Sequence, residues 1–212
     1  HVKYRAKPKT QFSTKPKETP LPYQARLLVE ADTGQVLYED NPHKKWSPAS
    51  MTKMMLALIV MEKLKEGSIK LTEPVTVSRS AIHIGGSRVY LKEGEVFTLE
   101  ELMEAVMIAS ANDASAAVAE YVAGSVEDCV QLMNEHAQAL GMNDTQYFNV
   151  HGLPPGEGQQ ENMTTAYDSA ILARELITAY PEVLRWSSTK ETRFRDGKLL
   201  LTNTNHLIGN FP

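Results

Sequence analysis

Ser50 and Lys53 stand three positions apart at the predicted start of a long apolar helix that runs to about Leu64. Positions i and i+3 are neighbours on a helix surface, so the hydroxyl and the amine are expected to face the same space. A serine becomes a strong nucleophile when a nearby base takes its proton, and a neutral lysine can serve as that base. The pair therefore indicates nucleophilic catalysis. The alternative is a chance Ser-x-x-Lys sequence at a helix start, with the lysine in solvent.

The pKa of Lys53 decides between these two interpretations. Free lysine titrates at about pH 10.4, so a lysine base near neutral pH needs its pKa lowered by roughly 3 units. Only desolvation or a neighbouring positive charge lowers it in this way. We therefore expect the helix start, which Pro48 precedes, to lie in a closed cleft.

Ser110 and Asn112 form a second candidate pair, in a predicted turn between two helices. The serine hydroxyl can pass a proton, and the asparagine amide can both donate and accept hydrogen bonds. Such a pair could relay a proton to a leaving amine and hold a substrate amide. The alternative is an ordinary polar turn in which Asn112 or Asp113 caps the following helix.

Hydrophobic periodicity and turn residues predict the elements that position these side chains. A hairpin is expected over 24–40, and Gly67 ends the helix that carries Lys53. The pattern Thr98-x-x-Glu101 predicts a capped helix start. Further helices are expected to end before 110 and to cover 114–122, 126–140, 164–179 and 181–186. Extended segments are expected over 72–80, 192–194 and 199–202, and a flexible loop at 85–87.

Composition excludes several functions. The 212 residues are 42% hydrophobic and 23% charged, which is typical of a globular protein, and the formal charge of −4 argues against nucleic-acid binding. Cys129 is the single cysteine and is expected to be a small buried residue. The six scattered histidines indicate no metal site, and no cofactor-binding loop is present. Residues 1–22 are basic and rich in proline and are expected to form a flexible leader.

Together the two pairs resemble the serine β-lactamase/DD-peptidase superfamily, and most of all its low-molecular-mass penicillin-binding proteins, the D-alanyl-D-alanine carboxypeptidases. The resemblance covers about 25–212. Supporting stretches are Asp32-Thr33-Gly34-Gln35-Val36-Leu37-Tyr38, Pro48-Ala49-Ser50-Met51-Thr52-Lys53, Gly85-Gly86-Ser87, Ser110-Ala111-Asn112-Asp113-Ala114, Met133-Asn134, Gly141-Met142-Asn143-Asp144-Thr145 and Asn149-Val150-His151-Gly152-Leu153-Pro154.

The resemblance implies an α+β fold in which an antiparallel sheet is flanked by helices and joined to an all-helical lobe of about 68–165. Residues 23–212 would form an incomplete catalytic domain. Ser50 would attack the penultimate D-Ala of a peptidoglycan stem peptide, and Lys53 would take its proton. Ser110 and Asn112 would relay a proton and orient the substrate, which Ser87 and Asn112 would also bind. β-Lactam antibiotics would inhibit by leaving a slowly hydrolysed ester on Ser50.

One departure from the family is serious, because no Lys-Thr-Gly or Lys-Ser-Gly occurs in the sequence. In the family that strand follows shortly after a segment resembling 202–212, and it supplies an oxyanion N–H whose loss costs about 10²–10³ in rate. We therefore expect a fragment of a larger protein, without the C-terminal sheet strands and without the family's amphipathic membrane anchor. The family also implies export to the outer face of the bacterial cytoplasmic membrane, next to the cell wall.

Other functions are compatible with the same motifs. A β-lactamase would need a deacylating glutamate in a Glu-x-x-Leu-Asn pattern, which Glu157 and Glu161 lack. A non-catalytic penicillin-sensing or wall-binding module would explain the missing third motif. A general serine esterase is disfavoured because no Gly-x-Ser-x-Gly surrounds Ser50.

Overall fold

The computed structural model describes residues 23–210, so the predicted leader at 1–22 lies outside the described residues. The strands are β1 (Arg26–Val29), β2 (Val36–Asp40), β3 (Pro74–Thr76), β4 (Val96–Thr98), β5 (Glu191–Phe194) and β6 (Leu199–Thr202). The α-helices are α1 (Lys53–Glu66), α2 (Leu99–Ile108), α3 (Asn112–Ala123), α4 (Val126–Ala139), α5 (Ala166–Ala179) and α6 (Leu184–Ser187). Three short 3₁₀ helices complete the structure: η1 (Ala49–Thr52), η2 (Ala81–His83) and η3 (Pro181–Val183).

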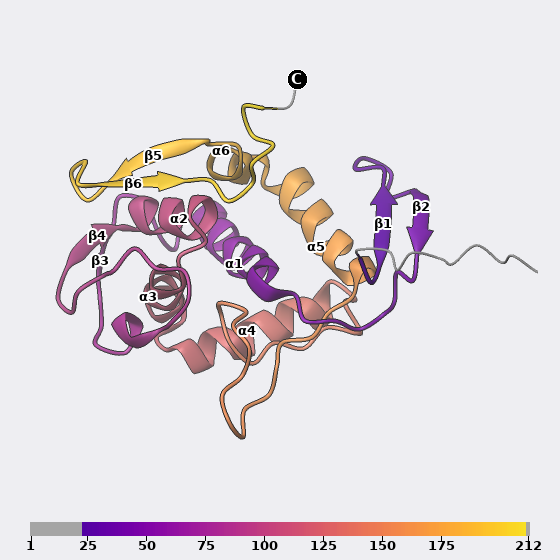
Figure 1. Ribbon diagram of the computed structural model, residues 1–212, viewed down its shortest axis with the longest axis horizontal. Helices are drawn as coiled ribbons and strands as arrows, with labels where there is room; N and C mark the ends of the chain where they lie inside the picture. Colours follow the sequence, from indigo (N-terminus) through magenta and orange to yellow (C-terminus); the bar gives the residue numbers. More distant parts are fainter. Residues whose placement is uncertain (1–22, 211–212) are drawn as a thin grey trace, which may run out of the picture.

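Helix α1 is the centre of the structure, and Figure 1 shows the other helices arranged around it. All seven residues from Met55 to Met61 are buried, so the helix is apolar on every side instead of along one stripe. It packs against α2, α3, α4 and α5. Gly67, with φ +75°, ends the helix as expected. A helix enclosed in this way holds its first residue, Lys53, in a fixed place.

The start of this helix differs from the prediction that Ser50 opens the α-helix. Residues Ala49–Thr52 form the 3₁₀ turn η1, and the α-helix begins only at Lys53. Ala49 has φ +46°, outside helical geometry. In a 3₁₀ helix residues i and i+3 lie directly above one another, so this geometry still places Ser50 on the same side as Lys53.

Helices α2, α3 and α4 follow one another and pack together. The capping box predicted at the start of α2 is present, because Thr98 and Glu101 exchange side-chain and backbone hydrogen bonds. Helix α3 begins at Asn112, two residues before the predicted start, and its N-cap is Ala111 instead of Asn112 or Asp113. The extent of a helical lobe over 68–165 stays a prediction.

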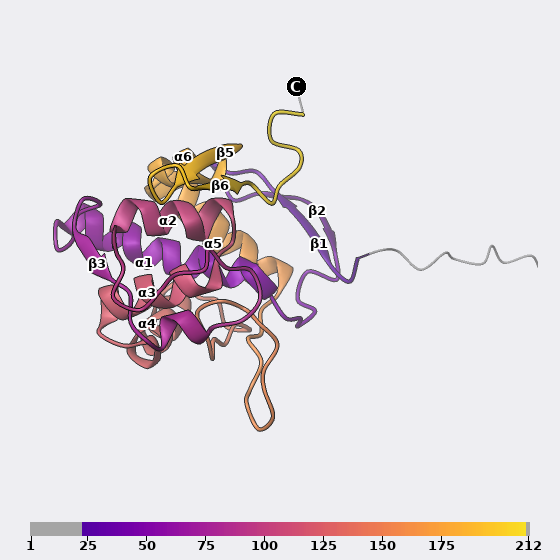
Figure 2. The ribbon, with the colours of Figure 1, turned by 60° about the vertical axis from the view of Figure 1, so that its left-hand side comes forward.

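The strands form three separate antiparallel pairs, which are β1–β2, β3–β4 and β5–β6. Figure 1 shows β1–β2 at one edge of the molecule and β5–β6 along α2, and Figure 2 shows the same separation from another side. Helix α5 packs against β1, and α2 packs against β5. The result is a mixed α+β fold with its core between the helices. No helix among residues 23–210 has the length and apolar character needed to cross a membrane.

Candidate active site

Three segments that are distant in sequence meet at the amine of Lys53, whose residue is only 3% exposed. Lys53 Nζ donates hydrogen bonds to Asn112 Oδ1 at 2.7 Å, to the His151 carbonyl oxygen at 3.0 Å and to Ser50 Oγ at 3.3 Å. Ser50 itself is exposed, so its hydroxyl joins the buried amine to solvent. We call these four groups the Lys53 site. They satisfy the three N–H donors of an ammonium group.

Burial is the main cause of the lowered pKa values in this site. It lowers the pKa of Lys53 to about 8, because desolvation disfavours the ammonium form. Burial and the charge of Lys53 lower the pKa of His151 to about 4. The Leu153 N–H donates to Nδ1 of His151 at 3.1 Å, so the neutral ring carries its proton on Nε2. Lys53 therefore has only uncharged partners and can exchange its proton at moderate pH.

The backbone explains why the side chain of Asn112 is free to reach Lys53. The Asn112 N–H, the first of helix α3, donates to the Ser87 carbonyl at 2.7 Å, and the Asp113 carboxylate accepts the Ala114 N–H, so the side chain of Asn112 is not needed as a cap. Asn112 Nδ2 donates to the Gly85 carbonyl at 2.9 Å, which leaves Oδ1 pointing at Lys53. A Cβ on Gly86 would lie 2.7 Å from Asn112 Nδ2, so the loop needs glycine there. The amide is therefore held at both ends.

Ser110 and Ser87 are the two predicted site residues that make no hydrogen bond to Lys53. Ser110 has φ +56°, and its Oγ is buried without a hydrogen-bond partner among residues 23–210. Burying a hydroxyl without a hydrogen-bond partner costs free energy of folding. The arrangement therefore fits a hydroxyl that forms a hydrogen bond when a substrate binds. Ser87 Oγ donates to the Ala109 carbonyl at 2.9 Å, which ties the loop to the end of α2. The structure thus joins Ser50, Lys53 and Asn112 by hydrogen bonds, whereas within residues 23–210 no hydrogen bond links the side chain of Ser110 or Ser87 to them.

The loop of residues 148–153 is a part of the site for which the sequence analysis assigned no role. Asn149 Oδ1 accepts the N–H groups of His151 at 3.2 Å and Gly152 at 2.6 Å, which fixes the turn that presents the His151 carbonyl. Gly152 has φ +79°, and a Cβ there would lie 1.8 Å from the Ala49 carbonyl oxygen. The Asn-x-x-Gly spacing was the available signal, since asparagine followed by glycine is typical of turns.

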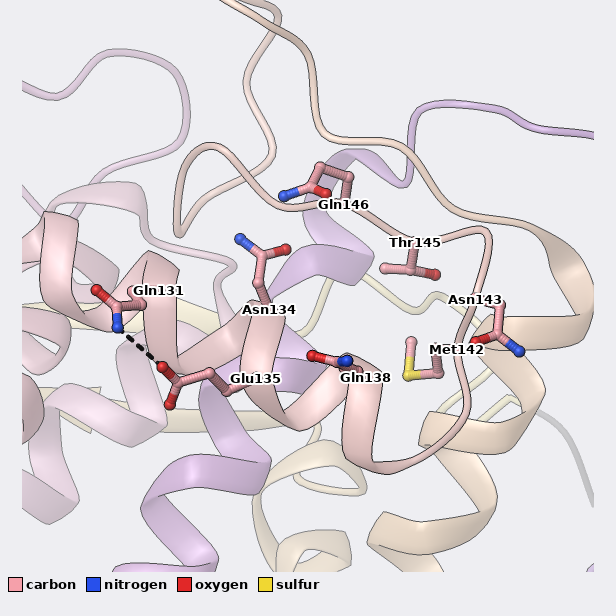
Figure 3. A pocket seen from close by; sticks show the side chains of 8 residues that line it. All are labelled: Gln131, Asn134, Glu135, Gln138, Met142, Asn143, Thr145 and Gln146. Atoms are coloured by element: carbon pink, nitrogen blue, oxygen red, sulfur yellow. Dashed lines mark hydrogen bonds between the residues drawn. The ribbon is translucent and has the colours of Figure 1, made fainter.

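A pocket lies apart from these residues, on helix α4 and the segment that follows it. Figure 3 shows this pocket of about 400 Å³, which is lined mostly by side-chain amides and contains the Gln131–Glu135 hydrogen bond of 2.8 Å. None of its lining residues belongs to the Lys53 site. It offers neither a nucleophile beside a base nor, within the described residues, a cluster of metal-binding side chains.

Comparison with known proteins assigns the family. A family model described as D-alanyl-D-alanine carboxypeptidase matches residues 12–212. The chain belongs to this family. It is 41% identical over 189 residues to the D-alanyl-D-alanine carboxypeptidase DacF of Bacillus subtilis, a match that covers 88% of this chain and 47% of the relative. It is 40% identical over 191 residues to DacC of Escherichia coli, covering 87% and 46%. The chain thus spans about half the length of these carboxypeptidases.

Solved structures share the fold of this chain. A peptidoglycan synthesis regulatory factor, PBP3 of Streptococcus pneumoniae, matches with a TM-score of 0.82 and 34% identity, over 89% of this chain and 55% of that one. Penicillin-binding protein D2 of Listeria monocytogenes, solved with ampicillin bound, matches with a TM-score of 0.76 and 28% identity, over 87% and 73%. The expected α+β penicillin-binding-protein fold is confirmed.

Proposed function

We propose that this protein is a serine-type D-alanyl-D-alanine carboxypeptidase that removes the terminal D-Ala from peptidoglycan stem peptides. The observation that carries the proposal is the buried Lys53 amine, which lies 3.3 Å from Ser50 Oγ and has only uncharged partners. A lysine held in this way has the lowered pKa that a base for a serine nucleophile requires. The names of the relatives support the choice of substrate.

In the proposed reaction, neutral Lys53 takes the proton of Ser50 while Oγ attacks the carbonyl carbon of the penultimate D-Ala. An O–C bond forms, and the peptide C–N bond then breaks. The leaving D-Ala amine receives a proton that Lys53 passes on through Ser110, while Asn112 and Ser87 bind the substrate. Water, deprotonated by the same amine, then hydrolyses the Ser50 ester. Proton transfer by positioned groups of this kind contributes about 10²–10⁴ to rate.

We also propose that β-lactams acylate Ser50. Penicillin-binding protein D2 of Listeria monocytogenes has been solved with ampicillin and with cefotaxime bound, and it shares the fold of this chain. A strained β-lactam amide offers Ser50 the same kind of carbonyl as the peptide. When the lactam C–N bond breaks, the amine part stays covalently attached to the acyl part instead of leaving the site. The ester on Ser50 would therefore be long-lived. β-Lactams would then compete with the stem peptide.

The proposed substrate also sets the place of action. Peptidoglycan lies outside the cytoplasm, so we propose that the protein is exported to the outer face of the cytoplasmic membrane. Peripheral attachment to that membrane is part of the same proposal. Fractionation of cells that produce the tagged natural protein tests this proposal. Recovery from the cytoplasm would contradict it.

The direct test uses the full-length natural protein with a pentapeptide ending in D-Ala-D-Ala. We expect release of one D-Ala per peptide, and loss of that release in Ser50→Ala. Trapping with labelled penicillin distinguishes the alternatives. Slow loss of label supports a carboxypeptidase, fast loss indicates a β-lactamase, and labelling without D-Ala release indicates a sensing module. Absence of both labelling and D-Ala release would overturn the proposal.

A further inference from the structure

Asn162 is a buried residue, 1% exposed, that lies outside the Lys53 site and uses its whole side-chain amide. Its Oδ1 accepts the N–H groups of Phe148 at 2.7 Å and Asn149 at 3.0 Å. Its Nδ2 donates to the Asn149 carbonyl at 3.0 Å and to Thr52 Oγ1 at 3.0 Å, and it also contacts Asn149 Oδ1 at 3.3 Å. Asn162 thus joins two segments that are far apart in sequence.

Both segments act on the same amine. Thr52 lies in η1, directly before Lys53, and is itself fully buried. Asn149 fixes the turn whose His151 carbonyl accepts a hydrogen bond from Lys53 Nζ. Asn162 therefore holds the backbone that carries Lys53 against the backbone that carries its acceptor. Thr52 and Asn162 are 110 residues apart, so this connection exists only in the folded chain, where the Trp46–Thr164 backbone pair lies next to it in sequence.

We propose that Asn162 is a positioning residue for catalysis: through Thr52 and Asn149 it keeps the 148–153 loop closed over the Lys53 amine. Without this connection the loop would separate from η1, and water would reach Nζ. The amine would then regain its hydration and lose its fixed distance to Ser50 Oγ. The inference rests on the proposed acylation of Ser50, but the state of the amine can be measured separately.

The ionisable groups around Lys53 are few, which makes its titration a clean reporter. His151, on the 148–153 loop, has its pKa lowered to about 4 and is neutral over the useful range. Asp113, on α3, accepts three backbone N–H groups and faces the segment at 89–91. Arg88, in the loop at 85–89, lies over the ring of Tyr90. A shift in the Lys53 titration thus reports mainly the access of water to Nζ.

Asn134 provides the matched control. Like Asn162, it ties the same part of the chain by accepting the Tyr147 N–H at 2.8 Å and donating to the Tyr147 and Val130 carbonyls at 2.8 and 3.0 Å. It comes from α4 and lines the pocket in Figure 3, away from the Lys53 site. A purely structural role predicts that Asn162→Ala and Asn134→Ala have similar consequences. A positioning role predicts that only Asn162→Ala changes the chemistry.

The first measurement is the rate of Ser50 acylation by a fluorescent penicillin across pH, in the full-length natural protein. We expect Asn162→Ala to slow acylation by about 10²-fold at neutral pH, as misplacement of a reacting group by about 1 Å can. We also expect the pH midpoint of acylation to move upward by about one unit as desolvation is relieved. Asn134→Ala should leave both unchanged. Equal effects of the two substitutions would overturn the proposal.

The second measurement is the ¹⁵N NMR titration of the Lys53 amine, assigned with Lys53→Met. If wild-type protein is not acylated, the proposed function fails, but a higher Lys53 midpoint in Asn162→Ala would still support the positioning role. An unchanged midpoint would reject it. Thr52→Val removes the Oγ1 acceptor of Asn162 with little change in shape and should also raise the Lys53 midpoint. Thr52→Ser keeps a hydroxyl acceptor and should leave the Lys53 midpoint at its wild-type value. This pair remains informative if Asn162→Ala does not fold.

Discussion

Lys53 and Asp113 are both buried charged residues near the Asn112 turn, yet their surroundings differ. Asp113 is 1% exposed, and its carboxylate accepts backbone N–H groups from Val89 at 3.1 Å, Leu91 at 3.0 Å and Ala114 at 3.0 Å. Lys53 is 3% exposed, and its amine donates to three uncharged acceptors, which are Asn112 Oδ1, the His151 carbonyl and the Ser50 hydroxyl. We call the carboxylate and its N–H donors the Asp113 site.

This difference in surroundings indicates a structural role for the Asp113 site and a chemical role for the Lys53 site. The three backbone N–H groups at the Asp113 site have the carboxylate as their acceptor, so removing it leaves buried donors unpaired. The three partners of Lys53 accept hydrogen bonds from its ammonium form. When the amine is neutral, the Ser50 hydroxyl can instead donate a hydrogen bond to it. Burial brings the two protonation states of Lys53 close in free energy, with its pKa at about 8. The Asp113 site therefore fixes the fold, and the Lys53 site exchanges protons.

The sharpest test of this difference is Lys53→Met. We expect acylation by penicillin to fall by about 10²–10⁴-fold, because the proposed general base is lost. The free energy of unfolding at pH 7 should change little, because removing a buried cation without a counter-ion offsets the cost of leaving Asn112 Oδ1 and the His151 carbonyl without a donor. Stopped-flow labelling and denaturant unfolding measure the two quantities. A large loss of stability would show that the Lys53 site is mainly structural.

A second test concerns the packing that closes the Lys53 site. Gly152→Ala should lower the free energy of unfolding by about 3 kcal/mol or more, because the new Cβ would overlap the Ala49 carbonyl. Gly141 is the matched control, since it has φ +75° and nothing within 4 Å of an added Cβ. Gly141→Ala should cost only about 1–2 kcal/mol from backbone strain. Equal losses would mean that the close contact at Gly152 is unimportant.

At the Asp113 site, Asp113→Ala should lower the free energy of unfolding by about 3 kcal/mol, because the buried N–H groups of Val89 and Leu91 lose their acceptor. Glu127→Ala, in the exposed first turn of α4, is the control and should cost about 0.5 kcal/mol. Denaturant unfolding measures both. If Asp113→Ala were as mild as the control, the carboxylate would not have the structural role assigned to it.

The smallest expected effect is the pH dependence of stability. Because the pKa of Lys53 is about 8 in the folded protein, below its ordinary value, the unfolded state binds more protons between these two values. The free energy of unfolding should therefore rise with pH, by about 2 kcal/mol from pH 8 to pH 10 relative to Lys53→Met. Below pH 8 the two proteins should show parallel curves. Parallel curves over the whole range would indicate an ordinary lysine.

Local sequence patterns predicted most of the fold. The Thr98–Glu101 capping box and the end of α1 at Gly67 are confirmed, because caps and left-handed glycines depend on neighbouring residues alone. The burial of Cys129 is confirmed as well. The Ser50–Lys53 spacing placed the hydroxyl and amine on one side, which is observed.

Other features depend on contacts that no local pattern contains. Helix α3 begins at Asn112, whose N–H the distant Ser87 carbonyl accepts, so Asn112 is not the N-cap, and Asp113 accepts the Ala114 N–H from inside the first turn. The His151 carbonyl reaches Lys53 from 98 residues away, and only the folded chain brings them together. The same holds for the contact between Asn162 and Thr52. The groups proposed to react were thus visible in the sequence, while the residues that hold them were not.

The most direct test of the central claim is mass spectrometry of the full-length natural protein after reaction with benzylpenicillin. We predict a single added penicilloyl group on the peptide that carries Ser50, formed more slowly below pH 8 as Lys53 becomes protonated. Ser50→Ala should carry no adduct. An adduct on another residue, or labelling of Ser50 that persists unchanged in Lys53→Met, would contradict the account.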